Sequence, residues 1–140
     1  MSLRHPEAKM SKSSDDIAGT IYITDDDEEI IKKLKTSVTD SGSKISYDKE
    51  NKPGISNLLE ILASITSRSV EQTLNEVSGM QYGDFKMHVS DELISFLSPI
   101  REVYLGLTDK KILQISKEGS EKAKITADET LVEVKNCLGI

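Results

Sequence analysis

The 140-residue sequence has few of the residues that build disulfides or bind transition metals. It contains one cysteine, two histidines and no tryptophan. A single cysteine, Cys137, excludes an internal disulfide and is typical of a reducing compartment. One cysteine and two distant histidines, His5 and His88, do not supply the four ligands of a structural zinc site, so no metal site is expected.

Long apolar runs and glycine-rich nucleotide turns are also missing. No apolar run approaches the roughly 20 residues that span a bilayer, so no membrane partner is expected. No G-x-G-x-x-G turn is present, which excludes that dinucleotide-binding fingerprint. With four tyrosines and two phenylalanines, the core has to be built from Leu, Ile, Val and Ala. A hydrophobic content of 36% with 30% charged residues fits one folded helical domain rather than a disordered chain.

The charge is acidic overall and unevenly distributed. The net charge of −6 argues against general nucleic-acid binding. An acidic chain can still bind RNA where its lysines gather on one face. Composition gives no positive support for this, although residues 30–52 are a basic region of the chain. The alternative for any lysine there is an ordinary solvated surface, and for either tyrosine it is a partly buried anchor of its loop. The candidate RNA contacts there are Lys32, Lys33, Lys35, Lys44 and Lys52, with Tyr47, and Tyr82 further along, able to stack on bases.

Hydrophobic periodicity predicts a mainly α fold. Residues 1–18 are expected to form a loop, and the alternating β-branched residues 20–24 predict one short strand. A helix is predicted after an N-cap among residues 25–27, with Val38 as the last residue of its apolar stripe. Further helices are predicted after a cap at Ser56 or Asn57, over 70–77, over 85–104 with a kink at Pro99, and from 108 or 109 to 138. These elements indicate a small helical bundle preceded by a loop and a strand.

One short basic motif, Lys9-Met10-Ser11-Lys12-Ser13, precedes the helical part. Its two lysines and two serines can place two ammonium groups and two hydroxyls on one phosphate chain. By spacing alone the motif is an exposed basic loop. Its letters, K-M-S-K-S, resemble the signature loop of class I aminoacyl-tRNA synthetases.

Flanking stretches resemble the tryptophanyl-tRNA synthetase family in particular, over residues 2–138. The family's other signature, a His-Ile-Gly-His-like turn, is absent, so the chain is expected to be the C-terminal part of such a synthetase. Ser14-Asp15-Asp16 stands where many relatives have Asp-Pro, which leaves the end of the loop undefined. The matching stretches are His5-Pro6-Glu7-Ala8, Thr39-Asp40-Ser41, Tyr47-Asp48, residues 52–59, residues 82–86 and Pro99-Ile100.

The resemblance implies a ligase that activates tryptophan with ATP and transfers it to tRNA-Trp. Lys9 and Lys12 are then the catalytic candidates at the pyrophosphate end of ATP. Met10, Ser11 and Ser13 complete an ATP-binding loop that is expected to be mobile. ATP would bring Mg²⁺ as a substrate ion, and no cofactor is expected on this chain. Residues 1–24 would end the catalytic domain, and residues 25–140 would form the helical domain that binds tRNA and its anticodon.

The same resemblance implies that the complete enzyme is a homodimer. The tryptophan pocket, most adenosine contacts and the dimer contacts would lie in the missing half, so the isolated chain is expected to be inactive and monomeric. The location is expected to be the bacterial cytoplasm or the mitochondrial matrix, and the Ser2-Leu3-Arg4 start and the Gly79-Met80 turn favour the mitochondrial form. The alternative is a helical interaction module without catalytic role, in which K-M-S-K-S is a chance match.

Overall fold

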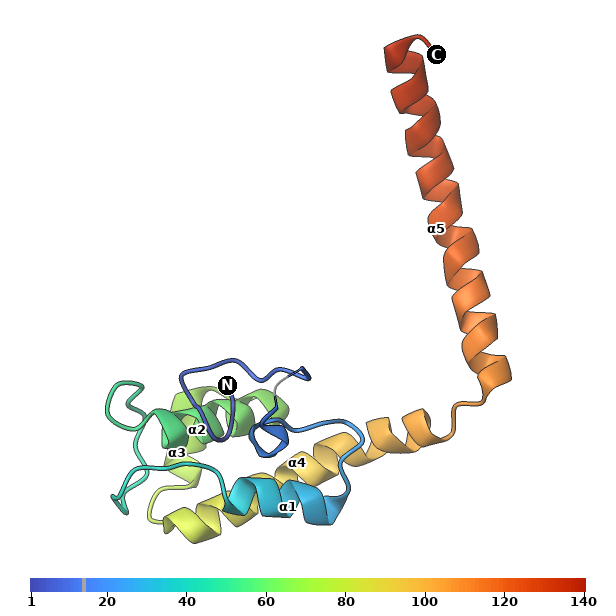
Figure 1. Ribbon diagram of the computed structural model, residues 1–140. Coiled ribbons are helices and arrows are strands. Elements are labelled where there is room, and N and C mark those ends of the chain that lie inside the picture. Colours follow the sequence, from blue (N-terminus) through green and yellow to red (C-terminus); the bar gives the residue numbers. More distant parts are fainter. Residues whose placement is uncertain (14) are drawn as a thin grey trace. The chain divides into compact units, whose positions relative to one another are not determined.

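The computed structural model describes residues 1–13 and 15–140 and confirms the mainly α fold. No strand occurs in the residues described, and no helix among them is both long and apolar enough to cross a bilayer. The chain divides into two compact units, residues 1–102 and 103–140. The elements (Figure 1) are η1 (Ile17–Gly19), α1 (Asp27–Lys35), α2 (Pro53–Ile65), α3 (Val70–Glu76), α4 (Tyr82–Leu105) and α5 (Asp109–Leu138).

The core of the first unit is built almost entirely from aliphatic side chains of α1, α2 and α4, around one fully buried aromatic ring, Phe85. Leu3 joins this core from the N-terminal segment and is only 2% exposed. The chain ahead of the basic motif is therefore packed against the helices. The functional division at residue 24 stays a prediction. The completely buried members of the core are Ile30, Leu34, Ile55, Leu59, Leu62, Val77, Phe85 and Val89.

The predicted strand over residues 20–24 is wrong, because this segment forms a turn. The Asp25 N–H donates to the Tyr22 carbonyl at 3.1 Å, and the Tyr22 N–H donates to the Asp25 carboxylate at 2.9 Å. A strand needs a neighbour for its backbone groups, whereas an aspartate side chain can satisfy them locally in a turn. The Asp25 carboxylate is also buried and lies 2.6 Å from the Lys33 ammonium of α1, which holds the turn against that helix.

The start of α1 agrees with the predicted cap. The Asp26 side chain accepts from the Glu29 N–H at 2.8 Å, and the Glu29 side chain accepts from the Asp26 N–H at 3.2 Å. This capping box satisfies two backbone donors that the helix itself cannot pair. The helix ends at Lys35, so Val38, which was predicted on its apolar stripe, lies beyond it and is exposed.

The second helix begins at Pro53, earlier than the predicted cap at Ser56 or Asn57. Proline suits the first helical turn because an N–H there has no partner within the helix. Gly54 then lies against the chain that follows α1, since an added Cβ would come within 2.0 Å of the Val38 carbonyl oxygen. The Pro-Gly pair therefore lets the start of α2 approach another backbone segment closely.

The remaining helices have ends that local sequence explains. Ser69 and Gln72 form a capping box at the start of α3. Pro99 lies inside α4, which continues to Leu105. Thr108 caps α5 by accepting from the Lys111 N–H at 3.3 Å, and Gly139 ends it with a φ of 73°, a conformation that glycine adopts without strain. No residue of α5 is buried.

Polar contacts attach both ends of α1 to α4, beside which it lies in Figure 1. The Arg101 guanidinium donates to the Asp25 carbonyl and to the Asp27 carboxylate at the start of α1. The Lys86 ammonium donates to the Ser37 carbonyl at 2.8 Å, just beyond the end of α1, and burial lowers the pKa of Lys86. The two helices therefore run antiparallel.

Candidate functional site

The basic motif, residues 9–13, lies at the surface on an irregular turn. Lys9, Ser11, Lys12 and Ser13 are exposed, whereas Met10 is half-buried and packs against the hydrophobic core. The methionine therefore anchors a segment whose cationic and hydroxyl groups face solvent. This arrangement leaves both ammonium groups available to a negatively charged ligand.

Ser11 shapes the turn through its side chain and its backbone. The Ser13 N–H donates to the Ser11 hydroxyl oxygen at 3.3 Å. The Thr20 hydroxyl donates to the Ser11 carbonyl, also at 3.3 Å, and so connects the motif to the chain after η1. Ser14, the first residue that departs from the expected family pattern, lies outside the described residues.

The chain enters and leaves the motif next to Ser2 and Leu3. The Ser2 N–H donates to the Ala8 carbonyl at 2.7 Å, immediately before the motif, and the Leu3 N–H donates to the Gly19 carbonyl at 2.9 Å after it. The Leu3 carbonyl in turn accepts from the Val38 N–H at 2.8 Å. Sequence reasoning missed this role of Ser2 and Leu3, because these contacts are backbone hydrogen bonds that leave no residue pattern.

Two consecutive residues of α2 hold the loops on either side of it. The Asn57 amide nitrogen donates to the Met1 carbonyl at 3.1 Å and to the Ser2 carbonyl at 3.3 Å. The Ser56 hydroxyl oxygen accepts from the Asp48 N–H at 2.9 Å. The prediction that one of these residues caps α2 is wrong, because the helix starts at Pro53. The proline itself was the signal that could have placed the helix start.

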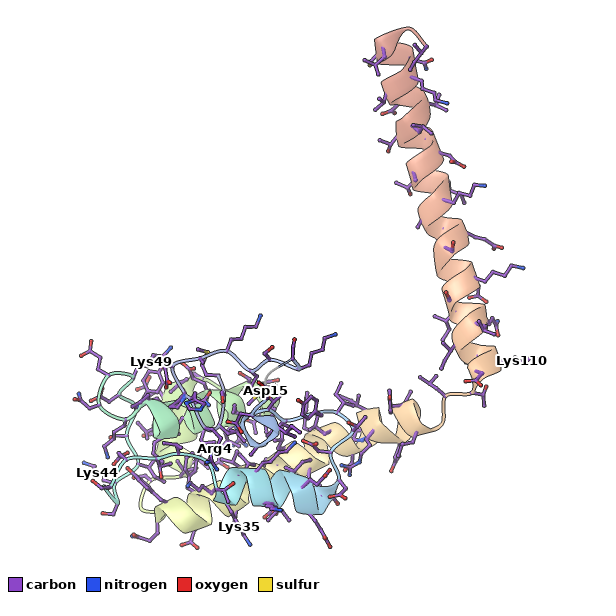
Figure 2. The ribbon with its side chains drawn as sticks, in the orientation of Figure 1. Arg4, Asp15, Lys35, Lys44, Lys49 and Lys110 are labelled. Carbon is purple, nitrogen blue, oxygen red and sulfur yellow. The ribbon has the colours of Figure 1, made fainter. Side chains whose placement is uncertain are left out.

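The loop between α1 and α2 carries the second group of candidate residues, and Figure 2 shows Lys44 and Lys49 on it. Its two ends are joined by a polar network around the Tyr82 hydroxyl. This hydroxyl donates to the Asp40 carboxylate at 2.9 Å and accepts from the Lys52 ammonium at 3.0 Å. Lys52 also donates to the Lys44 carbonyl at 2.7 Å. Lys52 and Tyr82, both candidate RNA contacts, therefore hold the loop in place.

The network sets the charge state of its members. Burial alone would raise the pKa of Asp40, but hydrogen bonds from Tyr82 and the Gly42 N–H, together with the Lys52 charge, lower it below its ordinary value. Burial of the Tyr82 phenol raises the pKa of Tyr82, and the Asp40 carboxylate adds to this effect while Lys52 opposes it. At neutral pH the carboxylate is thus charged and the phenol keeps the proton that it donates.

Tyr82→Phe is expected to lower the free energy of unfolding by about 1 kcal/mol at pH 7, because Asp40 loses a hydrogen-bond donor in a partly buried site. The pKa of Asp40 is lowered in the folded state, so this stabilisation is present above the ordinary value of 3.8 and is lost as the pH falls through the folded-state pKa. The difference in unfolding free energy between Tyr82→Phe and wild type should therefore become smaller in acid. Urea unfolding of both proteins at pH 7 and at a pH below the ordinary pKa of Asp40 measures this difference, with the exposed Tyr104→Phe as the control. An equal loss at both pH values would contradict this assignment.

The other candidate RNA contacts fall into two groups. Lys33 is buried, with its ammonium 2.6 Å from Asp25 and 4.8 Å from the Tyr22 ring centre, so its contacts are structural. Lys32, Lys35, Lys44 and Tyr47 are exposed.

Tyr47 is fixed at its hydroxyl end although its ring is exposed. The hydroxyl donates to Glu60 at 2.6 Å, and the Lys49 ammonium lies 2.7 Å from the same carboxylate. Hydrogen bonds from Lys49 and Tyr47 lower the pKa of Glu60. The ring therefore has a fixed orientation on the loop. Over residues 1–13 and 15–140, no group of three or more His, Cys, Asp or Glu side chains is arranged to hold a metal ion.

Comparisons with known proteins cover the whole chain. The model of a family described as tRNA synthetases class I (W and Y) matches residues 1–98. The tryptophan–tRNA ligases of Caldanaerobacter subterraneus and Enterococcus faecalis are 41% and 40% identical to the chain, and each match covers 100% of it. The chain spans only 43% and 42% of the lengths of these relatives. The crystal structure of tryptophanyl-tRNA synthetase from Mycoplasma pneumoniae matches with a TM-score of 0.82 at 29% identity, over 100% of this chain and 45% of that one.

Proposed function

Since the chain belongs to the family of class I tRNA synthetases for tryptophan and tyrosine, we propose that it is part of a tryptophan–tRNA ligase. Identity of about 40% to two such ligases along the whole chain carries this proposal. The chain spans less than half of those relatives, so activity is assigned to a longer protein. The chain has the motif at residues 9–13 but no His-Ile-Gly-His-like turn, which supports a place in the C-terminal part of that longer protein. A chance match to the motif is not favoured, because the family match extends to residue 98.

In the proposed reaction, Lys9 and Lys12 stabilise charge on the phosphates of ATP. A carboxylate oxygen of tryptophan attacks the α-phosphorus, and the bond from that phosphorus to the bridging oxygen breaks. Pyrophosphate leaves with the electron pair, so negative charge grows where two ammonium groups can meet it. Mg²⁺ arrives with ATP. The exposed lysines on a turn anchored by Met10 suit a loop that closes on ATP and opens for pyrophosphate.

The exposed basic surface of α1 and the following loop is the proposed contact with tRNA-Trp. Lys32, Lys35 and Lys44 are exposed there, and the fixed ring of Tyr47 offers a face on which an unpaired base can stack. Lys33 and Lys52 are left out of this surface because their ammonium groups are engaged within the protein. Phosphate contacts by the lysines would give affinity, and base contacts would give sequence preference.

Binding of the 140-residue chain to a tRNA-Trp transcript, beside the same transcript with its CCA anticodon altered, tests this function. We expect the altered anticodon to weaken binding about tenfold at every salt concentration, because base contacts do not depend on counterion release. Lys44→Ala should reduce the slope of log affinity against log salt concentration by about the amount expected for one phosphate contact, whereas Lys110→Ala on α5 should leave this slope unchanged. Equal binding of both transcripts would show that this chain does not recognise the anticodon. Absence of binding at low salt would contradict the RNA-binding role as a whole.

A further inference from the structure

We propose that Asn57 is a positioning residue for the basic motif at residues 9–13, acting through Ser2 and Leu3. The proposal rests on the proposed function, since it assigns the motif to ATP. Asn57 lies on α2 and is only 4% exposed. Its amide nitrogen donates out of the helix to two successive main-chain carbonyls, those of Met1 and Ser2. A buried amide needs such partners, so its placement couples the position of the N-terminal segment to that of α2.

Ser2 in turn fixes the residue that precedes the motif. The Ser2 N–H donates to the Ala8 carbonyl at 2.7 Å, and Ala8 is bonded covalently to Lys9. The Ser2 hydroxyl oxygen accepts from the N–H groups of Arg4 and His5, each at 3.2 Å. The intervening residues therefore form a closed turn whose shape depends on Ser2.

The chain that follows the motif returns to the same two residues. The Leu3 N–H donates to the Gly19 carbonyl at 2.9 Å. Gly19 is buried, and a Cβ on it would lie 2.5 Å from the Ser2 hydroxyl oxygen. An alanine at this position would therefore require the Ser2 hydroxyl to move. Both ends of the segment that contains Lys9 and Lys12 are thus held at Ser2 and Leu3, and Asn57 holds Ser2.

This connection gives Asn57 an influence on catalysis without contact to substrate. Displacement of a catalytic group by about 1 Å can cost on the order of a hundredfold in rate. Loss of the Asn57 amide would loosen Ser2, which holds the entry to the motif, while Leu3 stays fixed by the core and by the Val38 N–H. The lysine ammonium groups would then sample positions away from the phosphates. The expected consequence is a lower kcat, with the affinity for tryptophan unchanged.

Ser56, the preceding residue, is a matched control. It is 1% exposed, lies in the same turn of α2, and also accepts a hydrogen bond from a loop, the one donated by Asp48. Ser56→Ala therefore removes a comparable buried contact from the helix without touching the N-terminal segment. An effect of Asn57→Ala that Ser56→Ala lacks cannot arise from general weakening of α2.

The first arm of the test is amide hydrogen exchange in the 140-residue chain, read at Leu3, whose N–H donates to the Gly19 carbonyl, and at Ala8, whose N–H closes the same turn by donating to the His5 carbonyl at 2.8 Å. Asn57→Ala should speed exchange of both amides about tenfold relative to the core amides of α4, since it removes the two hydrogen bonds that the Asn57 amide donates and the one that it accepts from the Met1 ammonium. Ser56→Ala should leave them unchanged. Gly19→Ala, which crowds Ser2 from the other side, should speed exchange at Leu3 even if Asn57→Ala fails to fold. Unchanged exchange in a folded Asn57→Ala variant, or an equal increase in Ser56→Ala, would overturn the proposal, and unchanged exchange at Leu3 in Gly19→Ala would overturn the role of Ser2 in it.

The second arm is ATP–pyrophosphate exchange by the complete ligase. Asn57→Ala should lower kcat about tenfold with KM for tryptophan unchanged, and Ser56→Ala should keep the wild-type kcat. A normal kcat in Asn57→Ala beside faster amide exchange would overturn the catalytic consequence. Failure of the proposed function would give a different result, because substitution of Lys12 itself would then leave the rate of ATP–pyrophosphate exchange unchanged.

Discussion

Alanine in place of Lys12 is expected to slow ATP–pyrophosphate exchange by the complete tryptophan–tRNA ligase by about a thousandfold, which is typical for loss of one group that stabilises transition-state charge. Lys12 is exposed on the turn over residues 9–13, so its ammonium packs against no core residue. The substitution removes a charge where pyrophosphate departs and leaves the helices intact. Initial rates at saturating ATP and tryptophan measure the effect.

Lys110→Ala, on the exposed start of α5, is the control, and its exchange rate should equal that of wild type. Urea unfolding of the 140-residue chain should give the same free energy with and without Lys12→Ala. This pair of results separates a catalytic role from a structural one. A Lys12→Ala enzyme that retains the wild-type rate would contradict the assignment of the motif to ATP and favour a chance match.

Gly54→Ala is expected to lower the free energy of unfolding by about 3 kcal/mol, the upper end of the usual cost of overpacking. The added Cβ would lie 2.0 Å from the Val38 carbonyl oxygen and 3.2 Å from the Thr39 Cα. These are backbone atoms, so they cannot rotate away as a side chain can. The start of α2 and the chain after α1 would have to separate. Urea unfolding of the 140-residue chain measures the loss.

Gly83→Ala is the matched control, because it also lies near the start of a helix but has no atom within 4 Å of its added Cβ. Alanine is the better helix former, so this variant should be unchanged or more stable by up to about 1 kcal/mol. Similar free energies for the two variants would show that α2 does not approach Val38 as closely as described.

The two sets of contacts at the start of α2 explain why this helix matters to both candidate regions. Gly54 sets its distance from the chain after α1. Ser56 and Asn57 then hold, respectively, the loop that carries Lys44 and the segment that leads to Lys9. A displacement of the whole helix start, as in Gly54→Ala, is therefore expected to reach the proposed RNA surface and the proposed ATP loop together, whereas Ser56→Ala and Asn57→Ala each affect one of them.

The sequence by itself determined the features that depend on near neighbours. The capping box of α1, the threonine cap of α5 and its glycine end each involve residues within a few positions of one another, so local propensity is enough to predict them. The motif at residues 9–13 is likewise contiguous, and the stretches around it carried the resemblance to the family. The helical class followed from periodicity, which depends only on spacing along the chain.

Only the tertiary structure decided the features whose partners are distant in sequence. The Asn57 amide meets the Met1 carbonyl 56 positions away, and the Tyr82 hydroxyl meets Asp40 42 positions away. Residues 20–24 had a strand-like pattern, but the part of the chain that the structure describes offers them no neighbouring strand, and the buried contact between Asp25 and Lys33 stabilised a turn instead. The sequence pattern placed Lys33 on the surface, whereas in the structure its ammonium is buried and paired with the Asp25 carboxylate. Burial and pairing arise from packing between segments, and one-dimensional patterns contain no record of which segments meet.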